Sequence, residues 1–203
     1  MTKPLWETTY ADMEAKSFGD VSQEIFDLIP MLPSRAKILD LGCGDGRNAL
    51  PLARAGFDVT AIDLSQVGIH KLNTLAEREN LSIQTAVADM TTFKIPRDYD
   101  LIISQGCLHF VERRHWEQLI QDFKDHTKLH GFNAITVFTN EIPPPPELTD
   151  LCVGLFQEGE LYTMYSEWDI LLAKSYTFQD DHAGGIQHLH AANKLIARNI
   201  QMN

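Results

Sequence analysis

The sequence predicts an α/β fold, with a mostly parallel sheet and helices on both of its faces. Short runs of β-branched and aliphatic residues alternate with helical stretches over most of the 203 residues. The last two β-type runs follow each other without a helix between them, which indicates an antiparallel hairpin at the end of the sheet. The composition is 44% hydrophobic and 22% charged, which is enough to bury a core. We therefore expect one domain over residues 1–203.

The expected strands are short and lie between polar or turn-forming residues. They are Lys37–Leu41, Asp58–Leu64, Ile83–Val87, Tyr99–Ser104, Ala134–Thr139, Ile170–Thr177 and Leu189–Ile200. The expected helices are Gly46–Ala55, a helix capped by Ser65 that runs towards Asn80, Trp116–Lys128 with Gly131 as its stop, and a helix near Gly159–Glu167. Pro51 is compatible with the first helix because it falls near the first turn. The run Pro143–Pro146 predicts a stiff loop after the fifth strand.

Charge and composition exclude several classes of partner. The formal net charge of −11 repels nucleic acid unless a basic patch overcomes it, and Arg113-Arg114 stands beside Glu112 and Glu117. No apolar run is long enough to span a membrane, and the first residues, MTKPLWETTY, carry no signal-peptide core. The three cysteines suit a reducing compartment. We expect a cytoplasmic protein that acts on a small molecule, with no nucleic acid or membrane partner, and the oligomeric state stays open.

The segment DLGCGDG carries the main functional signal. It follows a predicted strand and opens a predicted helix, and its glycines let the backbone turn sharply and approach a ligand closely. A dinucleotide site needs G-x-G-x-x-G. The register from Gly42 places Arg47 at the third glycine, and the register from Gly44 fits only with alanine there. Asp40 and Asp45 flank the loop and would repel a pyrophosphate, so the loop favours a cationic ligand with an amino-acid end.

Further polar residues stand where the next strands end. Asp63 closes the second strand, 21 residues after Gly42, and suits hydrogen bonds from both hydroxyls of a ribose; a turn or cap role is the alternative. Asp89 and Met90 follow the third strand and suit an adenine amino group and ring; a turn aspartate and a core methionine are the alternative. Gln105 follows the fourth strand, at the carboxyl edge where open α/β sheets bind ligands.

These segments resemble a known family. The stretch ILDLGCGDGRNALPLARAGFDVTAIDLS, followed by AVADM and YDLIISQGCLHFV, is similar to motifs I to IV of class I S-adenosylmethionine-dependent methyltransferases. Nearly the whole chain resembles the tellurite-resistance methyltransferase family within that class, through Arg47-Asn48, the segment Glu158–Trp168 and the ending LIARN. The resemblance implies a Rossmann-like, seven-stranded sheet with a final antiparallel hairpin, S-adenosyl-L-methionine as the cofactor, and methyl transfer to a small-molecule acceptor.

The residues and the resemblance together predict the cofactor site. Its expected members are Tyr10, Asp40, Gly42, Gly44, Arg47, Asn48, Asp63, Leu64, Asp89, Met90 and Gln105. Arg47 is expected either to neutralise the methionyl carboxylate or simply to start the helix. The resemblance also implies that residues 1–30 form a helical segment that folds over the cofactor, with Trp6 and Tyr10 as its lid. Packing of this segment on the surface is the alternative.

Two histidines are the candidate catalytic residues at the acceptor end. His109 follows the fourth strand and is expected either to contact the acceptor or to pack within its loop. The resemblance places His182 at the active site, in the expected connection between the last two strands. Ala183 and Gln187 stand where that family's oxyanion-binding arginines are expected.

The nature of the acceptor stays open at this point. A tellurite- or selenite-type oxyanion or a thiol needs little base catalysis, whereas an oxygen or amine acceptor would need a base such as one of the two histidines. A metabolite carboxylate or amine as acceptor, a noncatalytic S-adenosylmethionine binder and an NAD-dependent enzyme are the alternatives. His188 and His190 share one face of a strand, but no cysteine lies near them, and we expect no metal site.

Overall fold

The computed structural model describes residues 5–15, 21–182 and 186–201. A seven-stranded sheet with the order β3-β2-β1-β4-β5-β7-β6 forms its centre. The strands are β1 (Lys37–Leu41), β2 (Asp58–Asp63), β3 (Ile83–Val87), β4 (Tyr99–Gln105), β5 (Thr127–Phe138), β6 (Asp169–His182) and β7 (Ile186–Arg198). The first five strands are parallel, and β7 is antiparallel to both β5 and β6. The predicted fold class, with its antiparallel C-terminal hairpin, is confirmed.

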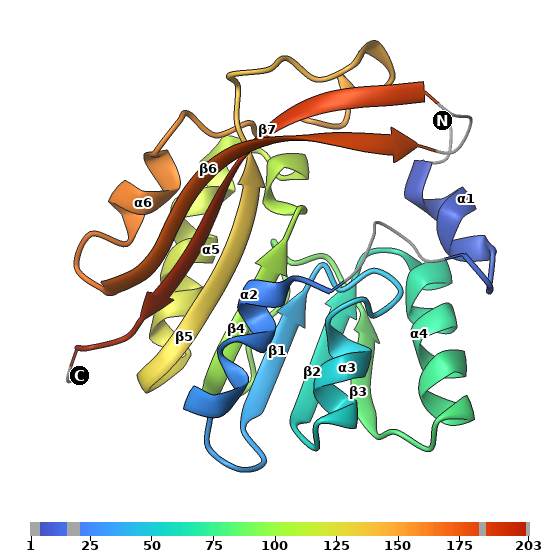
Figure 1. The fold of residues 1–203 in the computed structure, drawn as a ribbon, viewed down its shortest axis with the longest axis vertical. Coiled ribbons are helices and arrows are strands. Elements are labelled where there is room, and N and C mark those ends of the chain that lie inside the picture. The colour runs from blue at the N-terminus through green and yellow to red at the C-terminus, as the bar shows by residue number, and fades with distance from the viewer. Residues whose placement is uncertain (1–4, 16–20, 183–185, 202–203) are drawn as a thin grey trace.

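Six α-helices of the described residues surround the sheet (Figure 1). They are α1 (Leu5–Ala11), α2 (Gln23–Phe26), α3 (Ala49–Arg54), α4 (Gln66–Arg78), α5 (Trp116–Asp125) and α6 (Glu160–Met164). Short 3-10 turns occur at Ile29–Met31, Leu108–Phe110, Arg113–His115 and Pro146–Leu148. The predicted start of α4 is confirmed, because the Gly68 amide donates to Ser65 Oγ at 2.9 Å. No helix in the described part of the chain has both the length and the apolar character that crossing a membrane requires.

The sheet separates two hydrophobic cores. Ile38 on β1 packs with residues of α2, α3 and α4, whereas Leu39 and Leu41 pack with residues of α5 and α6. This alternation follows from the two-residue period of a strand, and full burial of each such side chain contributes about 1.5–3 kcal/mol. The cores fix the central strands, and so fix the positions of the loops that follow their carboxyl ends.

The boundary expected between the helix at Trp116 and the strand that follows it, α5 and β5 in the structure, is wrong. The helix predicted to reach Lys128 ends at Asp125, and the strand predicted to start at Ala134 starts at Thr127. Long-range contacts determine this boundary. Thr127 pairs with Tyr99 on β4, and the Asn133 amide donates to the Thr127 hydroxyl at 2.6 Å. These contacts outweigh the local helical pattern.

Gly131 therefore lies inside a strand and does not stop a helix. A Cβ at Gly131 would lie 2.9 Å from the Asp100 carbonyl oxygen on β4. The preceding His130 has a φ of 66°, so the chain kinks here. Gly131 allows β5 to pass close to β4 at this kink.

The hairpin of β6 and β7 bends over the carboxyl ends of the parallel strands (Figure 1). The two strands have 14 and 13 residues, and β6 extends well past the predicted end at Thr177. The helix α1 lies near the far end of this hairpin and beside α4 (Figure 1). The hairpin and α1 thus enclose the edge of the sheet where the functional residues were predicted.

Candidate functional site

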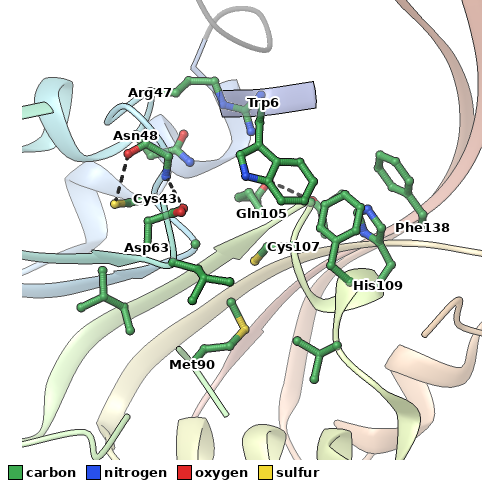
Figure 2. Close-up of a pocket in the computed structure, with 18 of the residues that line it drawn as sticks. Trp6, Cys43, Arg47, Asn48, Asp63, Met90, Gln105, Cys107, His109 and Phe138 are labelled. Carbon is green, nitrogen blue, oxygen red and sulfur yellow. Dashed lines mark hydrogen bonds between the residues drawn. The ribbon is translucent and has the colours of Figure 1, made fainter. Parts of the chain in front are cut away.

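A cavity of about 1420 Å³ opens at the carboxyl ends of β1, β2 and β4. It lies over the boundary between β1 and β4, where the order of the strands reverses and open α/β sheets bind ligands. All of the predicted cofactor residues except Asp40 line it: Tyr10, Gly42, Gly44, Arg47, Asn48, Asp63, Leu64, Asp89, Met90 and Gln105. Figure 2 shows several of these side chains around the cavity.

The loop after β1 approaches its neighbours too closely for side chains. Gly42 and Gly44 have φ values of 75° and 57°, in the left-handed region that favours glycine. A Cβ at Gly42 would collide with Cys107 Sγ, and one at Gly44 would collide with the Tyr10 hydroxyl. The Gly42 amide donates to the Ile62 carbonyl at 2.9 Å, which ties the loop to β2. Glycine at these two positions therefore lets Cys107 and Tyr10 pack directly against the backbone of the loop, which lines the cavity.

Asp63 joins this loop to the start of α4. Its Oδ2 accepts from the Gly44 amide and its Oδ1 from the Ser65 amide, both at 2.7 Å. Burial raises the pKa of Asp63, and these two hydrogen bonds oppose the rise. A carboxylate has about four acceptor positions, so each oxygen can still accept from a ligand hydroxyl. Asp63 thus positions the loop and also faces the cavity.

Asp40 lies behind the loop, outside the cavity lining. It is buried, and neither carboxylate oxygen has a hydrogen-bond partner among the residues that the structure describes. The pKa of Asp40 is raised to about 7, because burial and the charge of Asp63 raise it more than the charge of Arg47 and the backbone of Ala49 lower it. A buried carboxylate without hydrogen bonds is costly, so this position favours a positive charge nearby.

The other side of the loop offers apolar surface and one carboxylate. Leu64 is 68% exposed at the cavity, and Met90 packs against the core behind the loop. Asp89 Oδ1 accepts from the amide and the hydroxyl of Thr91, at 2.8 and 2.7 Å. This is the turn geometry that was the alternative for Asp89, and it occurs in a residue that also lines the cavity.

Polar side chains from α3 and β4 complete the floor of the cavity. Asn48 precedes α3, and its buried amide oxygen has no hydrogen-bond partner within the described ranges. The Gln105 amide donates to the Ala134 carbonyl at 3.1 Å and accepts from the Thr136 hydroxyl at 2.9 Å. Both ends of the Gln105 amide therefore bind β5, whereas the buried Asn48 oxygen is left without a partner in the described structure.

The N-terminal segment is anchored over the glycine loop. Tyr10 on α1 is buried against Gly44 and Gly68. Lys71 on α4 is also buried, with Nζ 2.9 Å from Asp45 Oδ2. The same Nζ donates to the carbonyl oxygens of residues 12 and 15, both at 2.8 Å. Lys71 thus joins the glycine loop to the segment predicted to be a lid.

A row of aromatic rings lines the side of the cavity opposite Asp63. We call it the aromatic wall; its members are Trp6, His109, Phe110, Tyr176 and Phe178, with Phe138 at its centre. The His109 ring stacks on Phe138 with centroids 3.9 Å apart and planes 8° apart. Trp6 lies between the glycine-loop side and this pair (Figure 2). The wall comes from α1, the turn after β4, β5 and β6.

Of the two predicted catalytic histidines, the structure describes the side chain of His109 but not that of His182. His109 is fully buried and lines the cavity, and neither ring nitrogen has a hydrogen-bond partner in the described part of the structure. Burial, with a smaller effect from His190, lowers the pKa of His109 to about 3. The backbone of His182 pairs with Ile186 at the end of β6, inside a strand and not in the expected connection. The side chain of His182, with Ala183 and that of Gln187, lies outside the described residues.

Lys71 and most of the aromatic wall were not predicted from the sequence. Lys71 lies on the buried face of α4 with Gly68 and Leu72, and a lysine at such a position is a sign of a buried ion pair. The aromatic residues come from segments far apart in the chain, and no local pattern connects them. Within the described residues, no group of three or more His, Cys, Asp or Glu side chains could hold a metal ion.

Comparison with known proteins points to the same family that the sequence motifs resemble. A family model described as tellurite resistance protein TehB matches residues 13–187. The probable S-adenosyl-L-methionine-dependent methyltransferase TehB of Haemophilus influenzae is 38% identical over 140 residues, which are 68% of this chain and 48% of that protein. The chain spans about half the length of the curated relatives it matches.

Solved structures share the fold. The crystal structure of TehB from Haemophilus influenzae superposes with a TM-score of 0.79 at 31% identity, over 88% of this chain and 62% of that chain. Coclaurine N-methyltransferase, solved with N-methylheliamine and SAH, gives a TM-score of 0.67 at 13% identity, over 97% of this chain and 82% of that chain. The second likeness is one of fold alone.

Proposed function

Because the chain belongs to the tellurite resistance protein TehB family, we propose that it transfers a methyl group from S-adenosyl-L-methionine to a small-molecule acceptor. The family predicted from the sequence is confirmed, and the fold is that of the class I methyltransferases. The observation that carries the proposal is the glycine loop between acidic side chains, at the bottom of a cavity over the β1–β4 boundary.

The residues present suit this cofactor. The backbone of Gly42 and Gly44 lines the cavity and would face a methionyl group, and Arg47 would pair with its carboxylate. The unpartnered carboxylate of Asp40 favours the positive charges of the cofactor. Asp63 would accept from the ribose hydroxyls. Asp89, Met90 and Leu64 would surround the adenine.

The protein's own contribution is orientation and exclusion of water. S-adenosylmethionine, when bound, supplies a methyl group on a sulfonium, which is already activated for displacement. Holding the two reactants in line can contribute about 7–11 kcal/mol. Trp6 and Tyr10 on α1 border the cavity above the loop and would cover the reacting atoms. The contacts of Lys71 would keep this cover in place.

The acceptor is a soft nucleophile, either a tellurite- or selenite-type oxyanion or a thiol. Such atoms need little base catalysis. His109 lines the acceptor side of the cavity, but burial lowers its pKa to about 3, so it is a weak base. An amine or a carboxylic acid, which has to lose a proton before it attacks, is therefore less suited to this site.

Two measurements test the proposal. S-adenosylmethionine and S-adenosylhomocysteine should raise the melting temperature, whereas NAD should not; a ligand at 100 times its dissociation constant stabilises by about 2.7 kcal/mol. An acceptor screen that includes tellurite, selenite and thiols should then release S-adenosylhomocysteine. A shift with NAD alone would contradict the cofactor. Cofactor binding without turnover of any acceptor would indicate a noncatalytic binder.

A further inference from the structure

The aromatic wall forms a continuous apolar surface on the acceptor side of the cavity. Ring centroids are 4.9 Å apart for Trp6 and Phe110, 4.0 Å for His109 and Phe110, and 5.5 Å for Phe138 and Phe178. Tyr176 continues the row, 5.7 Å from Phe178. Most of the predicted cofactor residues lie at the ends of β1, β2 and β3, whereas all of the wall except Trp6 lies at or after β4, β5 and β6. The cavity therefore has a polar end and an aromatic end.

Three basic side chains on the aromatic side are already paired with carboxylates. Arg113 Nη1 donates to Glu160 at 3.0 Å, and Arg114 lies 3.0 Å from Glu112. Lys194 lies over the Tyr176 ring, and its Nζ is 2.9 Å from Glu24 Oε2. All three cations line the cavity. An oxyanion bound at this end would share these cations with the carboxylates that already neutralise them, so it would gain little from them.

One polar group interrupts the aromatic surface. His109 is buried in the wall, and its ring nitrogens have no partner among the described residues. A buried nitrogen without a hydrogen bond is unfavourable, so a ligand that supplies the bond binds favourably. A neutral imidazole offers one donor and one acceptor, which suits an uncharged group such as a thiol.

We infer that the acceptor is an uncharged thiol with a flat apolar body, bound against the aromatic wall with its sulfur directed at His109. This inference rests on the proposed methyl transfer and names its substrate class. Aromatic rings stack on a flat body at little conformational cost, and the paired cations give no advantage to an anion. Thiol sulfur is also the soft nucleophile for which a weak base is sufficient.

The chemistry balances with these groups. The sulfur lone pair of the acceptor forms a bond to the methyl carbon as the bond from that carbon to the sulfonium breaks, and the breaking bond leaves its electron pair on the departing sulfur. The proton of the acceptor sulfur becomes strongly acidic once the sulfur is methylated. It passes to the neutral ring of His109, which then releases it to water. The products are a thioether, S-adenosylhomocysteine and a proton.

The decisive comparison is between acceptors that differ in charge. The purified chain with S-adenosylmethionine is given phenylmethanethiol, 3-mercaptopropionate, tellurite or selenite, and release of S-adenosylhomocysteine is measured. We expect kcat/KM for phenylmethanethiol to exceed that for 3-mercaptopropionate by about 100-fold, because burying an unpaired carboxylate is costly. As a readout independent of turnover, benzyl methyl sulfide should raise the melting temperature of the protein saturated with S-adenosylhomocysteine.

Two variants test the wall itself. Phe178→Ala should lower kcat/KM for phenylmethanethiol by about tenfold and leave 3-mercaptopropionate within about twofold. His109→Phe keeps the stack on Phe138 but removes the nitrogens, and should lower kcat for the thiol without changing cofactor affinity. The control is Leu171→Ala, an exposed position on β6 outside the cavity lining, which should change neither value.

The outcomes separate this inference from the proposed function. Preference for tellurite, selenite or 3-mercaptopropionate would overturn the thiol class and leave methyl transfer intact. Binding of S-adenosylhomocysteine without binding of either the thiol or its thioether would also overturn it. Failure to bind S-adenosylmethionine or S-adenosylhomocysteine would overturn the proposed function, and the inference with it.

Discussion

Replacing Asp40 with asparagine tests the electrostatics behind the glycine loop. Burial raises the pKa of Asp40 from 3.8 to about 7, against the opposing charge of Arg47. Between about pH 4 and pH 7 the folded protein therefore holds a proton at Asp40 that the unfolded chain has lost. The folded state binds more protons in this range, so the free energy of unfolding falls as the pH rises through it.

The size of the effect follows from the pKa difference. About three pKa units at 1.36 kcal/mol each correspond to about 4 kcal/mol. Asparagine is neutral at every pH and close in shape to the protonated acid. Asp40→Asn should therefore match the wild type near pH 4 and become more stable by up to about 4 kcal/mol at pH 8.

The assay is urea unfolding of the ligand-free protein at several pH values. Asp150→Asn is the matched control, because Asp150 is exposed, and its stability curve should stay parallel to that of the wild type. In the presence of S-adenosylmethionine the order should reverse above pH 7, because the ionised carboxylate attracts the positive charges of the cofactor. Parallel stability curves for Asp40→Asn and the wild type would refute the reasoning.

Three further predictions concern the loop and its anchor. Lys71→Met should cost about 3–5 kcal/mol of stability because it leaves Asp45 buried without its partner. Arg54→Met breaks an exposed ion pair and should cost much less. Urea unfolding compares the two variants, and equal losses would contradict the role of burial. Asp63→Ala should weaken S-adenosylmethionine binding by about 1.5–3 kcal/mol in calorimetry, and unchanged affinity in a folded variant would remove this residue from the site. Gly44→Val should abolish detectable binding in the same assay because its side chain would displace Tyr10 from the loop, and wild-type affinity would show that binding does not need this packing.

The sequence was most informative where local chemistry determines structure. The strands Lys37–Leu41 and Ile83–Val87 have the predicted bounds, because polar or turn-forming residues limit each apolar run. The predicted cofactor residues gather around one cavity because parallel strands bring their following loops to the same edge. Their roles in binding stay predictions until a ligand is measured.

The sequence was least informative where distant segments meet. The start of β5 at Thr127 depends on Tyr99 and Asn133, and neither contact has a local signature. The aromatic wall has the same origin, since Trp6 and Phe178 are at opposite ends of the chain and contribute to one surface. The buried ion pair of Lys71 could have been suspected from its place on an apolar helix face, but its carbonyl partners could not.

The position of β7 between β5 and β6 has a consequence for the order in which the molecule forms. Residues 169–182 precede β7 in the chain, yet β6 joins the sheet through β7, and β7 joins it through β5. As the chain is synthesised, the five parallel strands can assemble while β6 still has no strand to pair with. Tyr176 and Phe178 can reach the cavity only after residues 186–198 have been made. A nascent chain that stops before β7 would therefore have the glycine loop but an incomplete aromatic wall, and the edge of β5 would be open to pairing with other chains.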